Sequence, residues 1–418
     1  MEKKALQFPK GFLWGAATSA HQVEGGNTND WSEWEKEHAE RFAEEAKKHW
    51  EPWQQERFPE MFDPANYISG KAADHYHRYE EDFDIAKSLG HNAHRFSIEW
   101  SRIEPEEGKF DTKEIEHYRQ VIQALKKRGL EPFVTIWHWP LPLWLAEKGG
   151  WEAPGATMYF ERYAAKLASL FKDDVRFWIT INESQIYALH GYTTGEWPPG
   201  KKNVFLYFWV IHKIIGAHKK AYQAIKSLAP LAQVGVATHN IYFEAHQNTF
   251  INRMLKKAVD WWWNDYFLNK ISRYQDFVGL NNYLHNRIDY GFNKNENMKL
   301  SDMGWELYPE ALYYTLMGLK KYHVPVYVME SGLADADDSR REWFIKALVE
   351  QVYRANKSGV DVRGFLYWSL LDNFEWDKGF WPRFGLVEID YQTLERKIRP
   401  SARAYAEICR SNSLIQKE

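Results

Sequence analysis

The sequence predicts an α/β fold, a single closed (β/α)8 barrel of the TIM type. Eight short apolar runs rich in β-branched and aromatic residues recur along the chain, at 12–20, 91–100, 132–139, 176–183, 232–240, 276–283, 324–330 and 362–370. The runs are continuously apolar rather than alternating, as expected for parallel strands buried on both faces. Helical patterns separate them, and no Pro/Gly/Ser-rich linker divides the chain. We therefore predict a single domain over residues 1–418, with an open doubly wound sheet as the structural alternative.

The first predicted strand is followed by a charged, helix-prone insertion. Residues 35–58 read EKEHAERFAEEAKKHWEPWQQERF, and the whole insertion extends over about 35–64. Charged helices of this kind usually form solvated surface, and we interpret this one in that way. The alternative is that it shapes the entrance to the site, because a loop after a barrel strand lies on the active-site face.

The helices that follow are marked by apolar periodicity and by end signals. One begins at Asp111, which with Glu114 three residues later forms a capping box, and ends at Gly129. An earlier helix ends at Gly90, and its predicted apolar face consists of Ala72, Tyr76, Tyr79, Phe83 and Ala86. Further helices are predicted at about 157–171, 209–228 and 340–357.

Composition excludes several functional classes. The 54 Lys and Arg against 57 Asp and Glu give a net charge of −3 without a basic block, so we expect no nucleic-acid partner. The single cysteine, Cys409, rules out an internal disulfide and a thiolate metal cluster and favours a reducing compartment. The apolar run at 12–17 is interrupted before it reaches signal-peptide length, and no stretch approaches the roughly 18 to 20 apolar residues that span a bilayer. We therefore expect a cytoplasmic protein without a membrane partner; the sequence sets no oligomeric state.

Two glutamates close predicted strands. The run FWITINES ends in Asn182 and Glu183, and the run VPVYVMES ends in Glu330. In a parallel barrel the active site lies where the strands end, and a buried carboxylate is costly unless it is paired or its pKa shifts. An acid/base pair is therefore one hypothesis. The other is that each glutamate is a structural ion-pair partner, and strand-end position alone leaves the two hypotheses even.

Other polar and aromatic side chains fall at or near strand ends, namely Gln22, His138, Trp139, Asn281, Tyr283 and Trp368, and Arg95 lies within the second predicted strand. Each alone is usually a hydrogen-bonded core residue. Together they suit a sugar, because hydroxyls require fixed donors and acceptors while the apolar face of a pyranose packs against an indole. No P-loop, H-E-x-x-H or cysteine-based metal spacing is present, so we predict no metal and no cofactor. The run Trp261, Trp262 and Trp263 is most simply a packed face, and an aglycone platform or an oligomer contact comes second.

The chain resembles glycoside hydrolase family 1 nearly from end to end. FPKGFLWGAATSAHQVEGG (8–26) is similar to the opening signature of the family, NAHRFSIEWSRI (92–103) to its second-strand motif and TIWHW (135–139) to its His-Trp motif. TINES resembles the acid/base motif T-x-N-E-P, and VMESG resembles the nucleophile motif T-E-N-G. WSLLDNFEW (368–376) and RFGLVEIDY (383–391) resemble the C-terminal sugar-binding signature.

The resemblance implies a retaining β-glycosidase that acts by double displacement. Glu330 would be the nucleophile and Glu183 the acid/base, with their carboxyl groups roughly 5 to 5.5 Å apart. Glu183 would be protonated and Glu330 ionised in the free enzyme. Arg95 and Tyr283 would orient Glu330, and Asn182 would bind the sugar 2-hydroxyl. The remaining glycone contacts would come from Gln22, His138, Trp139, Asn281, Glu375 and Trp376, with Trp368 beneath the ring and Phe384 lining the pocket.

The same resemblance sets expectations for the substrate, a small-molecule β-glycoside or oligosaccharide. The charge of Glu375 would repel a 6-phosphate, so plain β-D-glucosides and β-D-galactosides are the expected glycones, with β-D-fucosides a further option. The chain departs from the family pattern at Ser184, Met329, Ser331 and Asn282, which we expect to alter rate and pH optimum.

Three other activities fit the same residues. A transglycosylase would use this site with a sugar or alcohol in place of water as acceptor. A catalytically weak sugar-binding barrel would keep the fold without the chemistry. An inverting hydrolase would require a wider gap between the two carboxyl groups.

Overall fold

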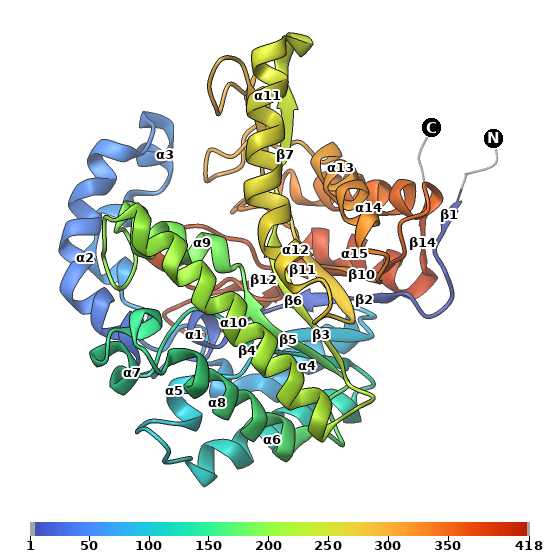
Figure 1. Cartoon of the computed structure of the whole chain (residues 1–418). Helices are drawn as coiled ribbons and strands as arrows, with labels where there is room; N and C mark the ends of the chain where they lie inside the picture. Colours follow the sequence, from blue (N-terminus) through green and yellow to red (C-terminus); the bar gives the residue numbers. More distant parts are fainter. Residues whose placement is uncertain (1–4, 416–418) are drawn as a thin grey trace.

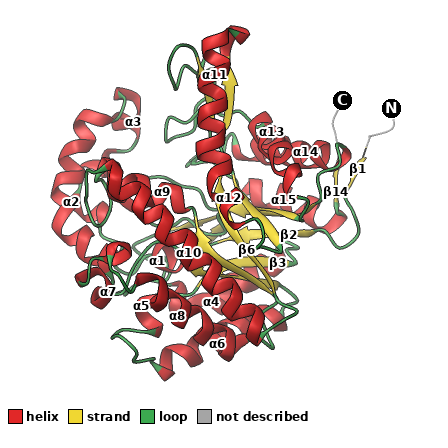
Figure 2. Cartoon of the chain, viewed as in Figure 1, coloured by secondary structure: helices red, strands yellow, loops and turns green. Residues whose placement is uncertain are grey.

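The computed structural model describes residues 5–415 and contains a closed barrel of eight parallel strands (Figures 1 and 2). Their order around the barrel is β10, β11, β2, β3, β4, β5, β6 and β8. The strands are β2 (Leu13–Ala17), β3 (Ala93–Ser97), β4 (Glu131–Trp137), β5 (Phe177–Asn182), β6 (Gln233–His239), β8 (Phe277–Asn281), β10 (Val326–Glu330) and β11 (Val362–Trp368). Seven of the predicted runs contain one strand each, and the remaining run, 132–139, contains all of β4 except Glu131, so the predicted TIM barrel is confirmed. Most runs extend past the strand into the loop at its carboxyl end.

Helices surround the barrel, as Figure 2 shows for the side that carries α4, α6, α8 and α10. The principal ones are α4 (His75–Ser88), α6 (Thr112–Lys127), α8 (Ala156–Phe171), α10 (Val204–Leu228), α13 (Glu310–Leu319), α14 (Arg341–Lys357) and α15 (Pro400–Ser411). Shorter helices lie in the loops: α5 (Trp100–Ile103), α7 (Leu143–Glu147), α9 (Ser184–Leu189) and α12 (Tyr266–Ile271). The inside of the barrel is filled by aromatic rings, with Phe133 and Phe177 stacked at 4.3 Å and Tyr327 against both.

Two predicted helix details are wrong. Asp111 caps α6 by accepting from the backbone N–H groups of Lys113 and Glu114, but the Glu114 carboxylate does not return the bond and instead accepts from the Tyr76 hydroxyl at 3.0 Å. The capping box is thus half formed, because a tertiary partner on α4 competes for Glu114. Ala72 lies before α4, in a left-handed turn with φ of 46°, rather than on its apolar face.

The charged insertion folds onto the barrel instead of lying free on its surface. After α1 (Ala20–Val23) it forms α2 (Asp30–His49), α3 (Pro52–Arg57) and the short 3-10 turns η1 (Pro59–Phe62) and η2 (Pro64–Tyr67). One face of α2 is buried, including Trp31, Glu35 and Phe42. The interpretation as purely solvated surface is therefore wrong for this face, because helical periodicity gathers the insertion's few apolar residues on one side.

A smaller unit projects from the barrel at the top of Figure 1. Strands β7 (Tyr242–Ala245) and β9 (His285–Ile288) pair in parallel, and α11 (Phe250–Val259) packs beside them. Leu255 and Val259 of α11 contact Phe243 and Ile288 in a separate apolar cluster. The helix continues through the π-helical turn η6 (Asp260–Asp265) into α12.

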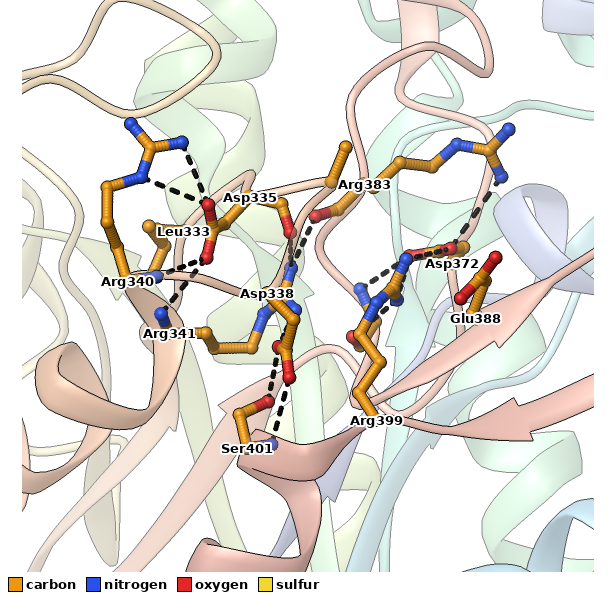
Figure 3. A network of polar contacts seen from close by, with 12 residues as sticks. Leu333, Asp335, Asp338, Arg340, Arg341, Asp372, Arg383, Glu388, Arg399 and Ser401 are labelled. Carbon is orange, nitrogen blue, oxygen red and sulfur yellow. Dashed lines mark hydrogen bonds and ion pairs between the residues drawn. The ribbon is translucent and has the colours of Figure 1, made fainter.

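The C-terminal segment takes part in two small two-stranded sheets outside the barrel. Strand β1 (Ala5–Gln7) pairs with β14 (Ser413–Ile415), and β12 (Val387–Ile389) pairs with β13 (Arg396–Ile398). Figure 3 shows how buried ion pairs hold the loops after β10 and β11: Asp335 accepts from Arg340, and Asp372 pairs with Arg399. None of the helices within residues 5–415 combines the length and apolar character that crossing a bilayer requires.

Candidate active site

A cavity of about 350 Å³ opens at the carboxyl ends of the barrel strands. Ten of the residues singled out from the sequence line it: Gln22, His138, Trp139, Glu183, Tyr283, Glu330, Trp368, Glu375, Trp376 and Phe384. The other three, Arg95, Asn182 and Asn281, are buried directly behind the lining and are hydrogen-bonded to it. The structure thus brings the whole predicted set together.

Glu330 ends β10 and is held from two sides. A guanidinium nitrogen of Arg95, on β3, pairs with Oε1, and the Tyr283 hydroxyl donates to Oε2 at 3.0 Å. Burial raises the pKa of Glu330, while the charge and hydrogen bond of Arg95 act in the opposite direction. These two donors favour the ionised carboxylate and fix its orientation.

Glu183 follows β5 directly and has a left-handed backbone, with φ of 42°. Asn281, the last residue of β8, donates to Glu183 Oε1 at 2.7 Å and to Asn182 Oδ1 at 3.1 Å. Burial and then the negative charge of Glu330 raise the pKa of Glu183 well above its ordinary value. The carboxyl group of Glu183 has no cation as a hydrogen-bond partner, so its protonated form is favoured.

One guanidinium connects four strands beneath the cavity. Besides pairing with Glu330, Arg95 donates to Asn182 Oδ1 at 2.7 Å and to Thr135 Oγ1 at 3.0 Å. Asn182 Nδ2 lies 3.1 Å from His138 Nε2, and burial followed by the charge of Arg95 lowers the pKa of His138. The arrangement fixes Asn182 and keeps His138 neutral.

The part of the cavity wall that contains Gln22 and Glu375 carries side chains suited to sugar hydroxyls. Gln22 donates to the Phe374 carbonyl at 2.9 Å and approaches Glu375 Oε2 at 3.4 Å. Burial, then the charges of Glu330 and Asp377, raise the pKa of Glu375 to about 8. Glu375 is therefore largely protonated at neutral pH, which weakens the expectation that its charge repels a 6-phosphate.

Several lining residues gave no signal in the sequence: Trp50, Ile186, His190, Trp197, His239, Leu284, Met303, Trp305, Asp377 and Lys378. Most lie in loops, helix turns or the insertion rather than at strand ends, and Trp50 follows α2. Asp377 and Lys378 directly follow Trp376, so the predicted sugar-binding signature pointed to within two residues of them. Trp197 packs between His190 at 4.5 Å and Trp139 at 4.6 Å.

The donor set does not form a metal centre. Within residues 5–415 no group of three or more His, Cys, Asp or Glu side chains is arranged to hold a metal ion. What the cavity offers instead is two neighbouring carboxyl groups in unlike surroundings, ringed by tryptophans and hydrogen-bonding side chains. Such a site can transfer a proton and stabilise a developing positive charge.

Comparisons with known proteins agree along the whole chain. The family model described as glycosyl hydrolase family 1 matches residues 4–251 and 240–414. A 1,4-beta-D-glucan glucohydrolase of Thermotoga neapolitana is 32% identical over 98% of this chain and 99% of its own, and a beta-galactosidase of Saccharolobus solfataricus is 30% identical over 97% and 96%. A beta-glycosidase from Pyrococcus horikoshii superposes with a TM-score of 0.87 at 35% identity, covering 99% and 97% of the two chains. A beta-glucosidase from Thermotoga maritima in complex with deoxynojirimycin has a TM-score of 0.85 at 29% identity, covering 97% and 99%.

Proposed function

The chain belongs to glycosyl hydrolase family 1 and is a glycoside hydrolase of the β-glycosidase type, and from this premise we propose a retaining mechanism with Glu330 as nucleophile and Glu183 as acid/base. The observation that carries the proposal is the asymmetry of the two carboxyl groups. Glu330 is paired with Arg95 and hydrogen-bonded by Tyr283, whereas Glu183 is hydrogen-bonded only by the neutral amide of Asn281. Unlike surroundings of this kind separate two pKa values and assign the acid and the nucleophile.

In the first step the Glu330 carboxylate attacks the anomeric carbon while Glu183 gives its proton to the departing glycosidic oxygen. The bond from the anomeric carbon to the aglycone breaks, an ester bond to Glu330 forms, and the aglycone leaves as an alcohol. The Asn182 amide, fixed by Arg95 and His138, is the group that we assign to the sugar 2-hydroxyl.

In the second step Glu183, now a carboxylate, takes a proton from water as the water oxygen attacks the anomeric carbon. The ester bond breaks, Glu330 is released as a carboxylate, and Glu183 ends protonated as it began. Two inversions at one carbon leave the product with the β configuration of the substrate.

For the glycone we propose β-D-glucosides and β-D-galactosides, with β-D-fucosides to be tested beside them. The names of the relatives support the first two: a beta-glucosidase A of Thermotoga maritima is 32% identical, and a beta-galactosidase of Pyrococcus woesei is 30% identical. Neighbouring structures also hold sugar-like inhibitors such as isofagomine lactam. We propose that Trp368, Trp376 and Trp139 pack on the sugar while Gln22, His138 and Glu375 bind its hydroxyls.

The test combines a substrate panel with product stereochemistry. The wild type is assayed on nitrophenyl β-glucoside, galactoside, fucoside and mannoside, and proton NMR of early time points is expected to show the β-anomer. Glu330→Gln and Glu183→Gln should each lose at least about 10³-fold in kcat on substrates with poor leaving groups, because each step needs both residues. Glu183→Gln should retain more activity on dinitrophenyl glycosides, whose leaving group needs no proton.

The outcomes separate the alternatives. An α-anomer as first product would establish inversion and overturn the covalent mechanism. Activity in Glu330→Gln equal to that of wild type would remove Glu330 from the chemistry. If added methanol converts most of the product into methyl glycoside, an acceptor other than water dominates and the protein is a transglycosylase.

A further inference from the structure

A row of apolar side chains along the projecting helix faces solvent. Phe250 is 70% exposed, Met254 is 54% exposed and Trp261 is 53% exposed. They recur at helical spacing along α11 and its continuation η6, and Ile251 is exposed beside them. The other side of the helix is the packed one, since Leu255, Val259 and Trp263 contact the β7–β9 core. The prediction that Trp261, Trp262 and Trp263 form a packed face is therefore only partly right.

The first turns of α10 extend this apolar surface. Phe205 is 81% exposed, and Val204, Phe208 and Trp209 are each about half exposed. The rings of Phe208 and Trp262 lie 4.8 Å apart, and those of Trp262 and Trp261 lie 6.3 Å apart. We call the exposed residues Val204, Phe205, Phe208, Trp209, Phe250, Ile251, Met254 and Trp261, joined through Trp262, the aromatic face. Large exposed apolar patches mark interaction surfaces, because leaving such rings in water is costly.

The charges without an ion-pair partner around the aromatic face are positive. Residues 197–243 contain no Asp or Glu, and Lys201, Lys202 and Lys213 stand at or near the start of α10. On α11, Arg253 and Lys257 flank the exposed row. Among the described residues these five cations have no carboxylate partner within 4.0 Å: Lys213 donates only to two backbone carbonyls, and Arg253 donates to the Asn248 carbonyl. Asp260, which adjoins the row, is already paired with Lys256.

Charge complementarity selects the occupant. A two-fold contact between copies of this chain would bring the same unpaired cations against one another, which is unfavourable. We propose that the aromatic face binds an anionic phospholipid bilayer surface, with its phenyl and indole rings at the boundary of headgroups and acyl chains and its lysines against the lipid phosphates. The sequence led us to expect no membrane partner because no stretch spans a bilayer, but a face that lies on the surface needs no spanning segment.

The aromatic face adjoins the wall of the catalytic cavity. Trp263 follows the exposed tryptophans, its ring lies 6.2 Å from that of His239, and its carbonyl accepts from Gln185. His239 lines the cavity. A bilayer docked on this face would therefore lie close to the substrate entrance, whichever glycoside the enzyme cleaves.

Vesicle co-sedimentation tests the proposal with the full chain. Wild type is expected to sediment with vesicles of phosphatidylcholine and phosphatidylglycerol (3:1) and much less with phosphatidylcholine alone, and 0.5 M NaCl should weaken binding by screening. The double variant Phe205→Ser/Trp261→Ser should bind at least about tenfold more weakly. Leu231→Ser, which removes an 89% exposed side chain from a different surface, is the matched control and should bind like wild type.

Hydrolysis of nitrophenyl β-glucoside in solution should be unchanged in both variants, which shows that they fold. The proposal is overturned if wild type binds neither kind of vesicle, or if it binds both equally and the double variant does the same. It is also overturned if light scattering shows a wild-type dimer that the double variant splits, because the face then belongs to a second copy of the chain.

Discussion

Glu183 directly follows β5 and Glu330 ends β10, but the two carboxyl groups have unlike neighbours. The charged partner of Glu330 comes from β3, and its hydroxyl donor, Tyr283, comes from the loop after β8. Glu183 accepts a hydrogen bond from the Asn281 amide, while the guanidinium of Arg95 bonds to Glu330 and Asn182 instead. The difference between the two carboxyl groups is therefore produced by side chains distant in sequence.

The departures from the family pattern sit beside these glutamates. Ser184 donates to Gln185 at 3.0 Å, and Asn282 donates to the Asn240 carbonyl at 2.9 Å. Met329 is fully buried, and the hydroxyl of Ser331 is buried without a hydrogen-bond partner in the structure. None of the four bonds to the carboxyl groups of Glu183 or Glu330, so both retain the contacts described above.

Removal of one donor tests the role of Tyr283. Tyr283→Phe deletes the 3.0 Å bond to Glu330, and we expect kcat/KM to fall roughly 10- to 100-fold, since hydrogen bonds to charged groups contribute about 1.5–3 kcal/mol. Loss of the bond also raises the pKa of Glu330. Because activity is lost as pH falls through this pKa, the acid limb of the pH–rate profile should move to higher pH.

The control is Tyr207→Phe, which removes a buried hydroxyl that does not line the cavity. This variant should keep the wild-type profile. An acid limb that stays in place in Tyr283→Phe would mean that Tyr283 does not tune the ionisation of Glu330.

Helix α2 supports the sugar-binding wall from behind. Glu35 accepts from His21 at 2.7 Å and from the Ser69 backbone and hydroxyl at 2.8 and 2.7 Å. The ring of His21 stacks on Trp376 at 5.7 Å, and Trp31 packs on Trp376 at 4.7 Å. Burial alone would lower the pKa of His21, but the charge of Glu35 raises it above its ordinary value, which favours the protonated imidazole. The insertion thus has a positioning role for Trp376.

We expect Glu35→Gln to disturb this support. The neutral amide removes the charge that holds His21 protonated, and the free energy of unfolding should fall by about 1–3 kcal/mol. The KM for glucosides should rise more than kcat falls, because Trp376 would be less well positioned in the sugar wall. Urea unfolding and steady-state kinetics measure both effects. Glu37→Gln, at an exposed position on the same helix, is the control; equal results for the two variants would refute the role of Glu35.

Buried carboxylates hold the C-terminal segment to the rest of the molecule by ion pairs. Asp372 pairs with Arg399 and Asp82 with Arg396, while Asp335 joins Arg340. Burial would raise the pKa of each carboxyl group, but the neighbouring cations hold all three below their ordinary value. The pairs of Asp335 and Asp372 thereby hold the loops that follow β10 and β11 (Figure 3).

These depressed pKa values predict acid sensitivity. Such a group contributes its full stabilisation above its unfolded pKa of about 3.9 and loses it as pH falls toward the lower folded pKa. The contribution of these three carboxylates to the free energy of unfolding in urea should therefore be constant near neutrality and decrease below about pH 4. Asp372→Asn should lose about 3–5 kcal/mol at pH 7, because Arg399 remains buried without its charge partner.

Asp361→Asn removes a carboxylate that is half exposed and pairs with Arg363, and it should change stability by less than about 0.5 kcal/mol. Equal stability of Asp372→Asn and wild type at pH 7 would show that the Asp372–Arg399 pair does not hold the C-terminal segment.

Much of the fold and of the site could be predicted because both depend on local patterns. The eight apolar runs coincided with the eight barrel strands to within one residue at their starts or extended beyond them. The polar residues that ended the runs, such as Glu183 and Glu330, had to converge at one rim of a parallel barrel. The predictions failed where a residue's partner is distant in sequence. Glu114 bonds to Tyr76 instead of its own helix end, and Glu35 is buried against His21 instead of solvated.

The sequence by itself determined the barrel, the two carboxyl groups and the family resemblance, since these follow from periodicity and short motifs. Only the tertiary structure decided which charges meet. The fold places Arg95 against Glu330, and it buries Glu375 near the charge of Glu330, which raises the pKa of Glu375. It also brings Trp50 from the insertion to the cavity and leaves the aromatic face exposed. The physical reason is that burial and electrostatic energy depend on distances between side chains, and a linear sequence holds no such distances until the chain has folded.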